Sequence, residues 1–257
     1  MPLKLNQWNN IVRWEFKHPI PFLRTREFLW QEGHNAFANE KEVQENTLLM
    51  LYIYEKTLKE LYALPALACK KSEKEKFAGA VYTLSLETLL PNGKAIQCCT
   101  SHNLGQNFSK PFDITYLDKN EKKQYAWQNS WGFTTRTIGI LIAMHGDDHG
   151  LVLPPNLAEI QVVIVPILFE ESKQKVIKKA HEIRKSLNKY RAYLDDREGY
   201  SAGWKFNEYE LIGIPLRVEI GPKDLEKNQV VLTRRDQGVK QFISLSEVAE
   251  KIPGFLA

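Results

Sequence analysis

The sequence is poor in cysteine and has no long apolar run. Its three cysteines are Cys69, Cys98 and Cys99, and none belongs to a Cys-x-x-Cys pair. This usage argues against a disulfide framework and fits a reducing compartment, so we expect a cytoplasmic location. No stretch reaches the roughly 18 apolar residues of a membrane helix, and the first ten residues lack the apolar core of a secretory signal. The sequence therefore predicts neither a membrane protein nor a secreted one.

The sequence also has no large excess of positive or negative charge. The 257 residues include 35 Lys and Arg against 31 Asp and Glu, a net charge of +4, which permits an RNA partner without requiring one. Residues 173–189 are the exception, because they hold seven basic residues and a single acid, Glu182. A basic helix can follow the phosphates of RNA, but on charge alone we favour a solvated helix face. The candidate RNA contacts are Lys175, Lys178, Lys179 and Lys185.

Residues 1–155 predict a mostly antiparallel α+β domain. Strands are predicted over residues 11–16, 23–37, 77–80, 82–90, 94–102 and 124–130. The first two form a hairpin with a long tip, and Pro91-Asn92-Gly93 is a turn between two later strands. Helices are predicted over residues 39–64 and 134–144. The longer helix has Asn39 as its cap and a buried side made of Val43, Met50, Leu51, Tyr54, Leu58 and Leu61.

Residues 156–257 predict a smaller α/β domain, which begins after Pro154-Pro155. Its first strand, residues 159–167, is apolar almost throughout, as in strands buried on both faces. The basic helix follows, then strands over residues 192–195, 211–220 and 230–234, with a short helix near Tyr200. Ser244 and Glu247 have the spacing of a capping box that begins a last helix. Alternating strands and helices predict a mixed sheet.

Charged and polar residues share one face of the predicted hairpin. Residues two apart in a strand point the same way, so Arg13 and Glu15 share a face. On the next strand a second set shares a face: Arg24, Arg26, Phe28, Trp30, Glu32 and His34. Burying these charges without partners would cost several kcal/mol each, so this face is a poor hydrophobic core. A binding site and an exposed set of ion pairs explain it equally well.

Three further stretches are chemically suggestive. Polar side chains occupy the predicted strand from Gln97 to His102, and a polar edge strand is the simpler explanation. The spacing of its cysteines and histidine fits no usual zinc motif. Residues 129–139 place a glycine-containing turn before a helix with Arg136 in its first turn. This arrangement suits an anion, although an ordinary capped helix explains it too. The His, Asp and Gly residues of 145–150 favour a turn over a metal site, and we predict no metal ligands.

These stretches, in this order, resemble prolyl-tRNA synthetases of the eukaryotic and archaeal type. Residues 12–34 look like motif 2 of a class II synthetase, and residues 132–139 look like motif 3. Residues 75–79 and 100–108 also match this family, and residues 151–155 resemble its junction to an anticodon-binding domain. Residues 213–222 extend the resemblance further. It implies a class II antiparallel sheet with helices, followed by a smaller α/β anticodon-binding domain.

The resemblance implies ATP- and Mg²⁺-dependent activation of L-proline and its transfer to tRNA(Pro). Catalysis would rest on Arg13 and Arg136. The implied ATP-site residues are Arg13 for the α-phosphate, Glu15 for adenine, Arg24 and Arg136 for the outer phosphates, with Gln97, Thr100 and Thr134 around them. The implied pocket for proline contains Trp30, Glu32, His34, Phe77, His102, Ser130 and Gly132. This chemistry needs positioning and charge neutralisation, which fits the lack of a nucleophile–base pair.

Some features depart from the family pattern. Motif 1, which forms the usual homodimer interface, and a proline-binding Thr-Ser-Glu loop lie upstream of motif 2 in the family, so we expect both to be missing here. A non-catalytic module that binds ATP or tRNA therefore remains the alternative. The family usually has two glycines in place of Cys98-Cys99. Because Gln97 and Thr100 are three apart, their use in one pocket predicts either a strained bulge at the cysteines or a regular strand from which Gln97 turns away.

Overall fold

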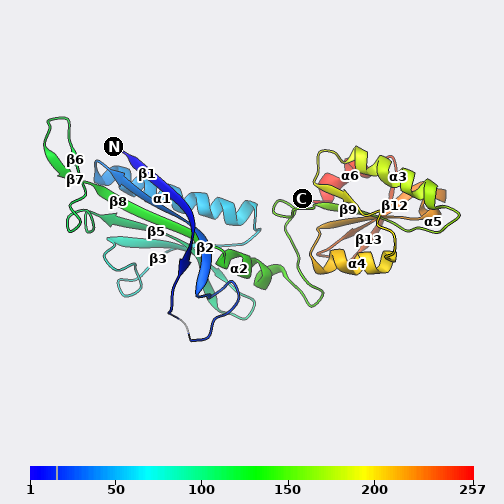
Figure 1. Cartoon of the computed structure of the whole chain (residues 1–257), viewed down its shortest axis with the longest axis horizontal. Helices are drawn as coiled ribbons and strands as arrows, with labels where there is room; N and C mark the ends of the chain where they lie inside the picture. The colour runs from blue at the N-terminus through cyan, green and yellow to red at the C-terminus, as the bar shows by residue number, and fades with distance from the viewer. Residues whose placement is uncertain (16) are drawn as a thin grey trace. The chain divides into compact units, whose positions relative to one another are not determined.

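The computed structural model describes residues 1–15 and 17–257, which form two compact units, Met1–Met144 and His145–Ala257 (Figure 1). Among the described residues, every helix is either too short or too polar to span a lipid bilayer. Each unit contains its own sheet.

The first unit is built on a six-stranded antiparallel sheet, which confirms the predicted α+β class. The strand order is β1-β2-β8-β5-β4-β3. These strands are β1 (Leu3–Val12), β2 (Glu27–Phe37), β3 (Leu67–Lys70), β4 (Tyr82–Leu89), β5 (Ala95–Gly105) and β8 (Trp127–Thr134). The short strands β6 (Thr115–Leu117) and β7 (Lys123–Tyr125) pair with each other. The predicted hairpin of the first two strands is confirmed, because β1 pairs with β2 in antiparallel register.

One face of this sheet is covered by helix α1 (Glu40–Glu60). The side chain of Asn39 accepts a hydrogen bond from the Glu42 N–H, as its capping role predicts. Buried contacts join α1 to the sheet: the Tyr54 hydroxyl donates to Gln31 Oε1 at 2.7 Å, and Ser101 Oγ donates to the Thr47 carbonyl at 2.8 Å. Leu61 was expected on the buried side, but it is 41% exposed because the helix ends at Glu60. The second helix of this unit is α2 (Arg136–His145).

Several predicted elements of the first unit are wrong in position. Residues 77–80 form a turn instead of a strand, with Gly79 at a φ of +88°. A Cβ atom on Gly79 would also lie 2.7 Å from the Phe108 ring. The first strand spans Leu3–Val12, while Phe16, which ends the predicted strand, lies outside the described residues. The predicted strand over residues 124–130 is split at Ala126 into β7 and β8.

The second unit contains a five-stranded mixed sheet, as predicted. Its order is β10-β9-β11-β12-β13, with β10, β9 and β11 parallel and the last two strands antiparallel. The strands are β9 (Val162–Pro166), β10 (Ala192–Leu194), β11 (Leu216–Ile220), β12 (Gln229–Arg234) and β13 (Lys240–Ser244). Helices α3 (Lys173–Ser186) and α6 (Val248–Phe255) pack on one core, and α4 (Ala202–Leu211) packs on the other face. A short helix, α5 (Pro222–Glu226), precedes β12.

The predicted capping box is wrong. Ser244 is the last residue of β13, and its hydroxyl lies 2.9 Å from that of Ser246. The last helix begins at Val248, and its cap residue Glu247 makes no side-chain capping bond. The predicted strand over 211–220 is also shorter, because α4 continues to Leu211 and the chain turns at Gly213, with a φ of +77°, before β11 begins.

Candidate active site

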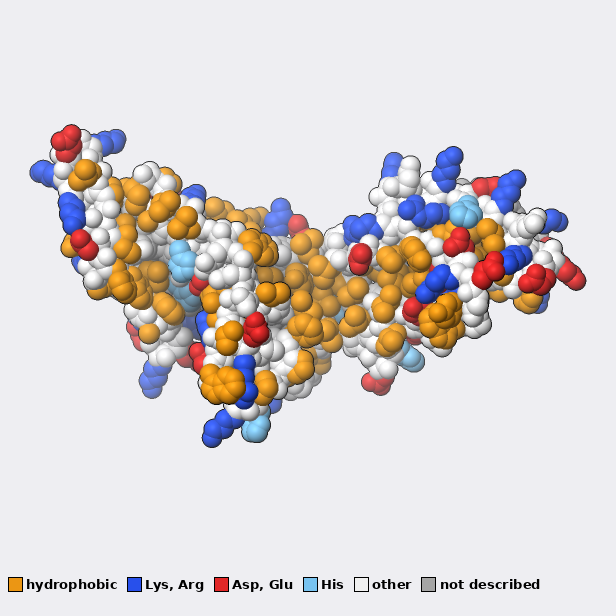
Figure 2. Space-filling model, viewed as in Figure 1, with side chains coloured by type: hydrophobic (Ala, Val, Ile, Leu, Met, Phe, Trp, Pro, Cys, Tyr) orange, Lys and Arg blue, Asp and Glu red, His pale blue; other side chains and the backbone are white. Residues whose placement is uncertain are grey.

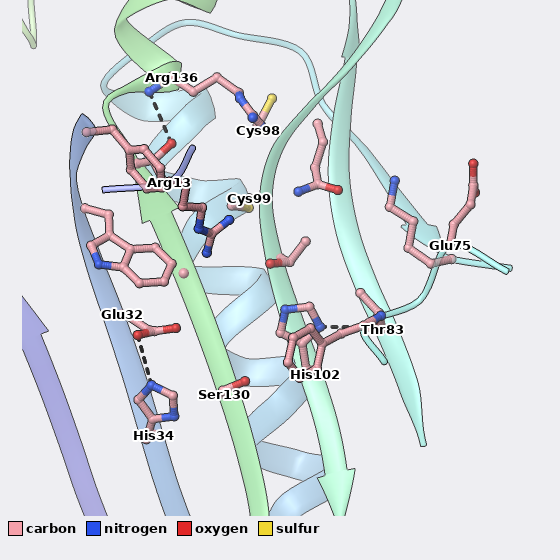
Figure 3. Close-up of a pocket in the computed structure, with 18 of the residues that line it drawn as sticks. Arg13, Glu32, His34, Glu75, Thr83, Cys98, Cys99, His102, Ser130 and Arg136 are labelled. Atoms are coloured by element: carbon pink, nitrogen blue, oxygen red, sulfur yellow. Dashed lines mark hydrogen bonds and ion pairs between the residues drawn. The ribbon is translucent and has the colours of Figure 1, made fainter. Parts of the chain in front are cut away.

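A cavity of about 550 Å³ opens on the face of the first sheet that α1 leaves uncovered. The alternation of the strands creates it. In β2, Gln31 contacts α1, whereas its neighbours Trp30 and Glu32 line the cavity. In β5, Ser101 contacts α1, whereas Thr100 and His102 line the cavity. Side chains from four strands thus line one space, together with residues from the loops at 22–25 and 71–77 (Figure 3).

Three arginines line one part of this cavity. Arg136 is the first residue of α2, and its Nε donates to the Leu23 carbonyl at 3.0 Å. Burial lowers the pKa of Arg136, and the nearby positive charges of Arg24 and Arg13 lower it further. The Arg13 guanidinium lies over Phe28 and Trp30, 5.5 and 5.8 Å from the ring centroids. Cations held this close together favour a polyanionic ligand.

A bulge in β5 brings Gln97 and Thr100 to the same cavity, which confirms the predicted distortion. Leu86 of β4 faces Cys99, and the next residue, Glu87, faces Gln97, so Cys98 is the extra residue. Of the two predicted outcomes the bulge is the one found, but without the positive φ that was expected to strain it, because neither cysteine is among the described residues with positive φ. Both thiols are buried in the core beneath the site, and burial raises the pKa of Cys98 to about 11. An inert, protonated thiol is the consequence.

Polar contacts organise the opposite part of the cavity. Glu32 Oε2 lies 3.0 Å from His34 Nε2 and accepts a hydrogen bond from Gln7 of the edge strand at 2.8 Å. The bond to Glu32 raises the pKa of His34. Trp30 is fixed by its indole N–H, which donates to Asn9 Oδ1 at 2.7 Å. A carboxylate and an oriented aromatic ring therefore stand together, a combination that suits a small cation with an apolar body.

A histidine and two phenylalanines form the remaining wall. His102 Nδ1 lies 2.9 Å from Thr83 Oγ1, and the Phe77 ring packs against the imidazole with 5.1 Å between centroids. Phe108 stacks on Phe77 at 6.0 Å. Burial lowers the pKa of His102 to about 4, although the charge of Glu32 acts in the other direction. His102 is therefore neutral at pH 7.

The structure brings together all the predicted ATP- and proline-site residues except Glu15. Glu15 is exposed and lies three residues beyond the end of β1, whereas Arg13 directly follows Val12 and its backbone N–H still donates to the Arg26 carbonyl at 2.7 Å. Sequence reasoning missed other lining residues: Lys71, Glu75, Thr83, Phe108 and Gln128. Thr83 had a usable signal, because it shares a face of β4 with Ser85 and Glu87, which are also polar and pair with Thr100 and Gln97 of β5.

The candidate RNA contacts lie on α3 of the second unit. Lys175, Lys178 and Lys185 are exposed, while Lys179 pairs with Glu182 at 2.5 Å. Figure 2 shows Lys and Arg side chains gathered over α3, with a few acidic ones among them. The helix ends at Ser186, so Lys189, which was expected on the same helix, lies beyond it.

A second surface of this unit was not predicted. Tyr200 and Trp204 stack on each other with 4.3 Å between centroids, although they are 49% and 45% exposed. The Arg197 guanidinium lies 5.1 Å from the first ring and 5.6 Å from the second. Arg197 is itself held by Asp195 and Glu208. An exposed aromatic pair backed by a fixed arginine is a platform on which a base can stack.

Comparison with known proteins agrees with this architecture. Residues 1–145 match the tRNA synthetase class II core domain (G, H, P, S and T), and residues 161–254 match the anticodon binding domain. The chain belongs to the class II tRNA synthetase core family.

Its relatives narrow the class further. The chain is 50% identical over 253 residues to the proline–tRNA ligase of Natranaerobius thermophilus, covering 98% of this chain and 52% of that protein. It is 48% identical over 260 residues to the cytoplasmic proline–tRNA ligase of Arabidopsis thaliana, covering 100% and 49%. The bifunctional glutamate/proline–tRNA ligase of Mus musculus is 49% identical over 262 residues, covering 98% and 17%. These matches confirm the resemblance to prolyl-tRNA synthetases. The chain spans about half the length of the first two.

Proposed function

We propose that the cavity binds ATP and L-proline and joins them as prolyl-adenylate, and that the prolyl group then passes to tRNA(Pro). The observation that carries this proposal is the division of one cavity into two chemically different parts. Arg13, Arg24 and Arg136 suit a triphosphate, and the part around Trp30 and Glu32 suits a small cyclic cation. Relatives similar along the whole chain are proline–tRNA ligases, which supports the choice of amino acid.

The proposed reaction needs little proton transfer. A carboxylate oxygen of proline attacks the α-phosphorus of ATP, a new P–O bond forms, and pyrophosphate leaves with the electrons of the broken P–O bond. The carboxylate is already ionised at neutral pH, so no general base is required. Arg13 and Arg136 would neutralise charge on the reacting phosphates, and Arg24 would hold the outer ones. Gln97, Thr100 and Thr134 would line the nucleotide site, and Glu15 remains a proposed adenine contact.

Mg²⁺ belongs to the same proposal. It prefers phosphate oxygens, water and one or two carboxylates as ligands, so the protein needs to supply only one or two ligands. Glu75 and Glu32 are the carboxylates that line the cavity, and Glu32 is already bound to His34. Among the residues that the structure describes, no group of three His, Cys, Asp or Glu is placed to hold a metal ion. A metal ion that arrives with the nucleotide fits these residues better than a resident one.

Proline-dependent exchange of labelled pyrophosphate into ATP tests the activity directly. We expect exchange with L-proline and none with threonine or histidine. Calorimetry with ATP and Mg²⁺ on the same protein separates the alternatives. ATP binding without exchange would support the non-catalytic module, and neither binding nor exchange would overturn both readings.

We propose that the second unit binds tRNA, as its match to an anticodon binding domain suggests. The exposed lysines of α3 would contact phosphates, and the Tyr200–Trp204 pair would stack on an unpaired base. A cytoplasmic location is part of this proposal, in keeping with the name of the Arabidopsis relative.

A further inference from the structure

Thr83 has no role in the proposed reaction, yet it is almost fully buried beside His102. Its hydroxyl oxygen lies 2.9 Å from His102 Nδ1 and also accepts a hydrogen bond from the Phe77 backbone N–H at 2.9 Å. Thr83 is 2% exposed. Figure 3 shows the bond between Thr83 and the imidazole at the side of the cavity.

The position of one proton follows from these two bonds. A hydroxyl has a single hydrogen, and the Phe77 N–H already donates to its oxygen. Among the described residues, the structure gives Thr83 Oγ1 no partner other than Phe77 and His102. If His102 Nδ1 carried a proton and donated it, the buried hydroxyl hydrogen would have no acceptor, which costs free energy. The arrangement with every group satisfied has the Thr83 hydroxyl donating to an unprotonated Nδ1.

A neutral imidazole with an unprotonated Nδ1 must carry its proton on Nε2. Nδ1 is occupied by Thr83, and His102 lines the cavity, so the Nε2–H group is the one available to a ligand. The ring is also held in its plane. Phe77 packs on it and is in turn backed by Phe108, which occupies the space that Gly79 leaves without a Cβ.

We propose that Thr83 is a positioning residue that locks His102 as the Nε2–H tautomer, so that His102 donates a hydrogen bond to a carboxyl oxygen of the amino acid. This inference rests on the proposed function, since it names one contact of the same site. The Nε2–H group cannot accept a hydrogen bond from the amino acid's ammonium, so that cation needs an acceptor elsewhere in the cavity, and Glu32 is the carboxylate beside Trp30. The tautomer thus determines that the carboxylate of proline faces His102 and its ammonium faces Glu32.

The test uses the full chain, labelled with ¹⁵N in its histidines, and the variants Thr83→Val and Thr83→Ser. Valine has nearly the same shape without the hydroxyl, and serine keeps the hydroxyl. Nitrogen chemical shifts show which ring nitrogen of His102 carries the proton, with His102→Gln used to assign the signals. We expect Nε2–H in the wild type and in Thr83→Ser, and a mixture of tautomers in Thr83→Val.

Binding provides the second measurement. A non-hydrolysable sulfamoyl analogue of prolyl-adenylate should lose about tenfold in affinity with Thr83→Val, a typical cost of one hydrogen bond, and recover with Thr83→Ser. ATP alone should bind all three proteins equally. A wild-type His102 protonated on Nδ1 would overturn the inference even if Thr83→Val failed to fold. So would an unchanged tautomer and unchanged analogue affinity in a folded Thr83→Val. If the analogue did not bind the wild type at all, the proposed function would fail, while the nitrogen shifts would still decide the tautomer.

Discussion

At the scale of single residues, Arg13 gives the most direct test of the nucleotide site. Its guanidinium lies against Phe28 and Trp30 in the cavity, so removing it takes away charge at the site without emptying the core. We expect Arg13→Ala to weaken ATP binding by roughly 1.5–3 kcal/mol, as for a charge-assisted hydrogen bond. Calorimetry with ATP and Mg²⁺ measures this. Arg234→Ala is the matched control, because Arg234 pairs with Asp236 in the second unit. Equal ATP affinity for wild type and Arg13→Ala would remove Arg13 from the site.

Replacing the two adjacent cysteines by glycine should affect ATP binding and the stability of the fold differently. We expect ATP to bind the Cys98→Gly/Cys99→Gly protein at least as well as the wild type, because neither thiol is needed for the reaction. The variant should nevertheless be less stable, by about 1–3 kcal/mol, since Cys99 is 3% exposed in the core and glycine loosens a strand. Urea unfolding gives the stability, with Cys69→Gly on the β3 strand as a control outside this core. Clearly weaker ATP binding at equal folded fraction would give the thiols a positive role.

At the scale of elements, the strand period explains both the correct and the incorrect predictions. It correctly placed Trp30, Glu32 and His34 on one face of β2, because that strand is regular. The strand period does not extend to Glu15, which lies three residues beyond the end of β1, whereas Arg13 directly follows Val12 and still pairs with the Arg26 carbonyl. The bulge at Cys98 was recoverable only by combining the period with the resemblance, which requires Gln97 and Thr100 in one pocket.

Elements that depend on distant partners could not be predicted locally. Strand β13 exists because it pairs with β12, and residues 229–233 supply partners that the local sequence around Ser244 does not reveal. The pairing of β13 with β12 therefore took precedence over the local capping pattern of Ser244 and Glu247. The turn at residues 77–80 depends on Phe108, which fills the space above Gly79. Tertiary contacts override local patterns in both cases.

Helix α3 carries the next prediction. Changing Lys175, Lys178 and Lys185 together to glutamine should weaken tRNA binding and flatten its salt dependence, because three exposed cations would no longer displace counterions from the phosphates. The measurement is a binding titration with tRNA(Pro) at several salt concentrations. The control changes Lys41, Lys56 and Lys59 of α1 in the same way. Unchanged binding by the α3 variant would mean that this helix is a solvated face, as its charge pattern alone suggested.

At the scale of the whole molecule, the cavity is assembled from segments that are far apart in the sequence. Residues near 13, 30, 83, 100 and 136 meet because β2, β8, β5 and β4 are neighbours in one sheet. From the residues alone, a binding site and an exposed set of ion pairs explained the charged face of the hairpin equally well, because no single segment determines the order of the strands in the sheet. The resemblance to a family indicated which distant segments meet at the site. It did not identify Thr83 as a residue that lines the cavity.

The acid stability of the chain should depend on one carboxylate of the second unit. Asp195 is fully buried and accepts hydrogen bonds from Arg197 and from the Tyr209 hydroxyl, while the Lys205 ammonium lies 3.3 Å away. Burial alone would raise the pKa of Asp195, but these bonds outweigh it and lower the pKa to about 2. A carboxyl group whose pKa is lower in the folded than in the unfolded state stabilises the fold above its unfolded pKa of about 3.9. That stability disappears as the pH falls from about 4 to about 2.

Asp195→Asn tests this because it removes the charge and keeps the shape. We expect it to lower the free energy of unfolding at pH 7 by about 3–5 kcal/mol, since the almost fully buried Lys205 loses its carboxylate. Its urea midpoint should also fall less than that of the wild type between pH 4 and pH 2. The neighbouring Asp196→Asn is the control, because Asp196 is exposed and lies 3.7 Å from His181. If both variants unfolded alike at pH 7, the network around Asp195 would contribute no more than a surface pair.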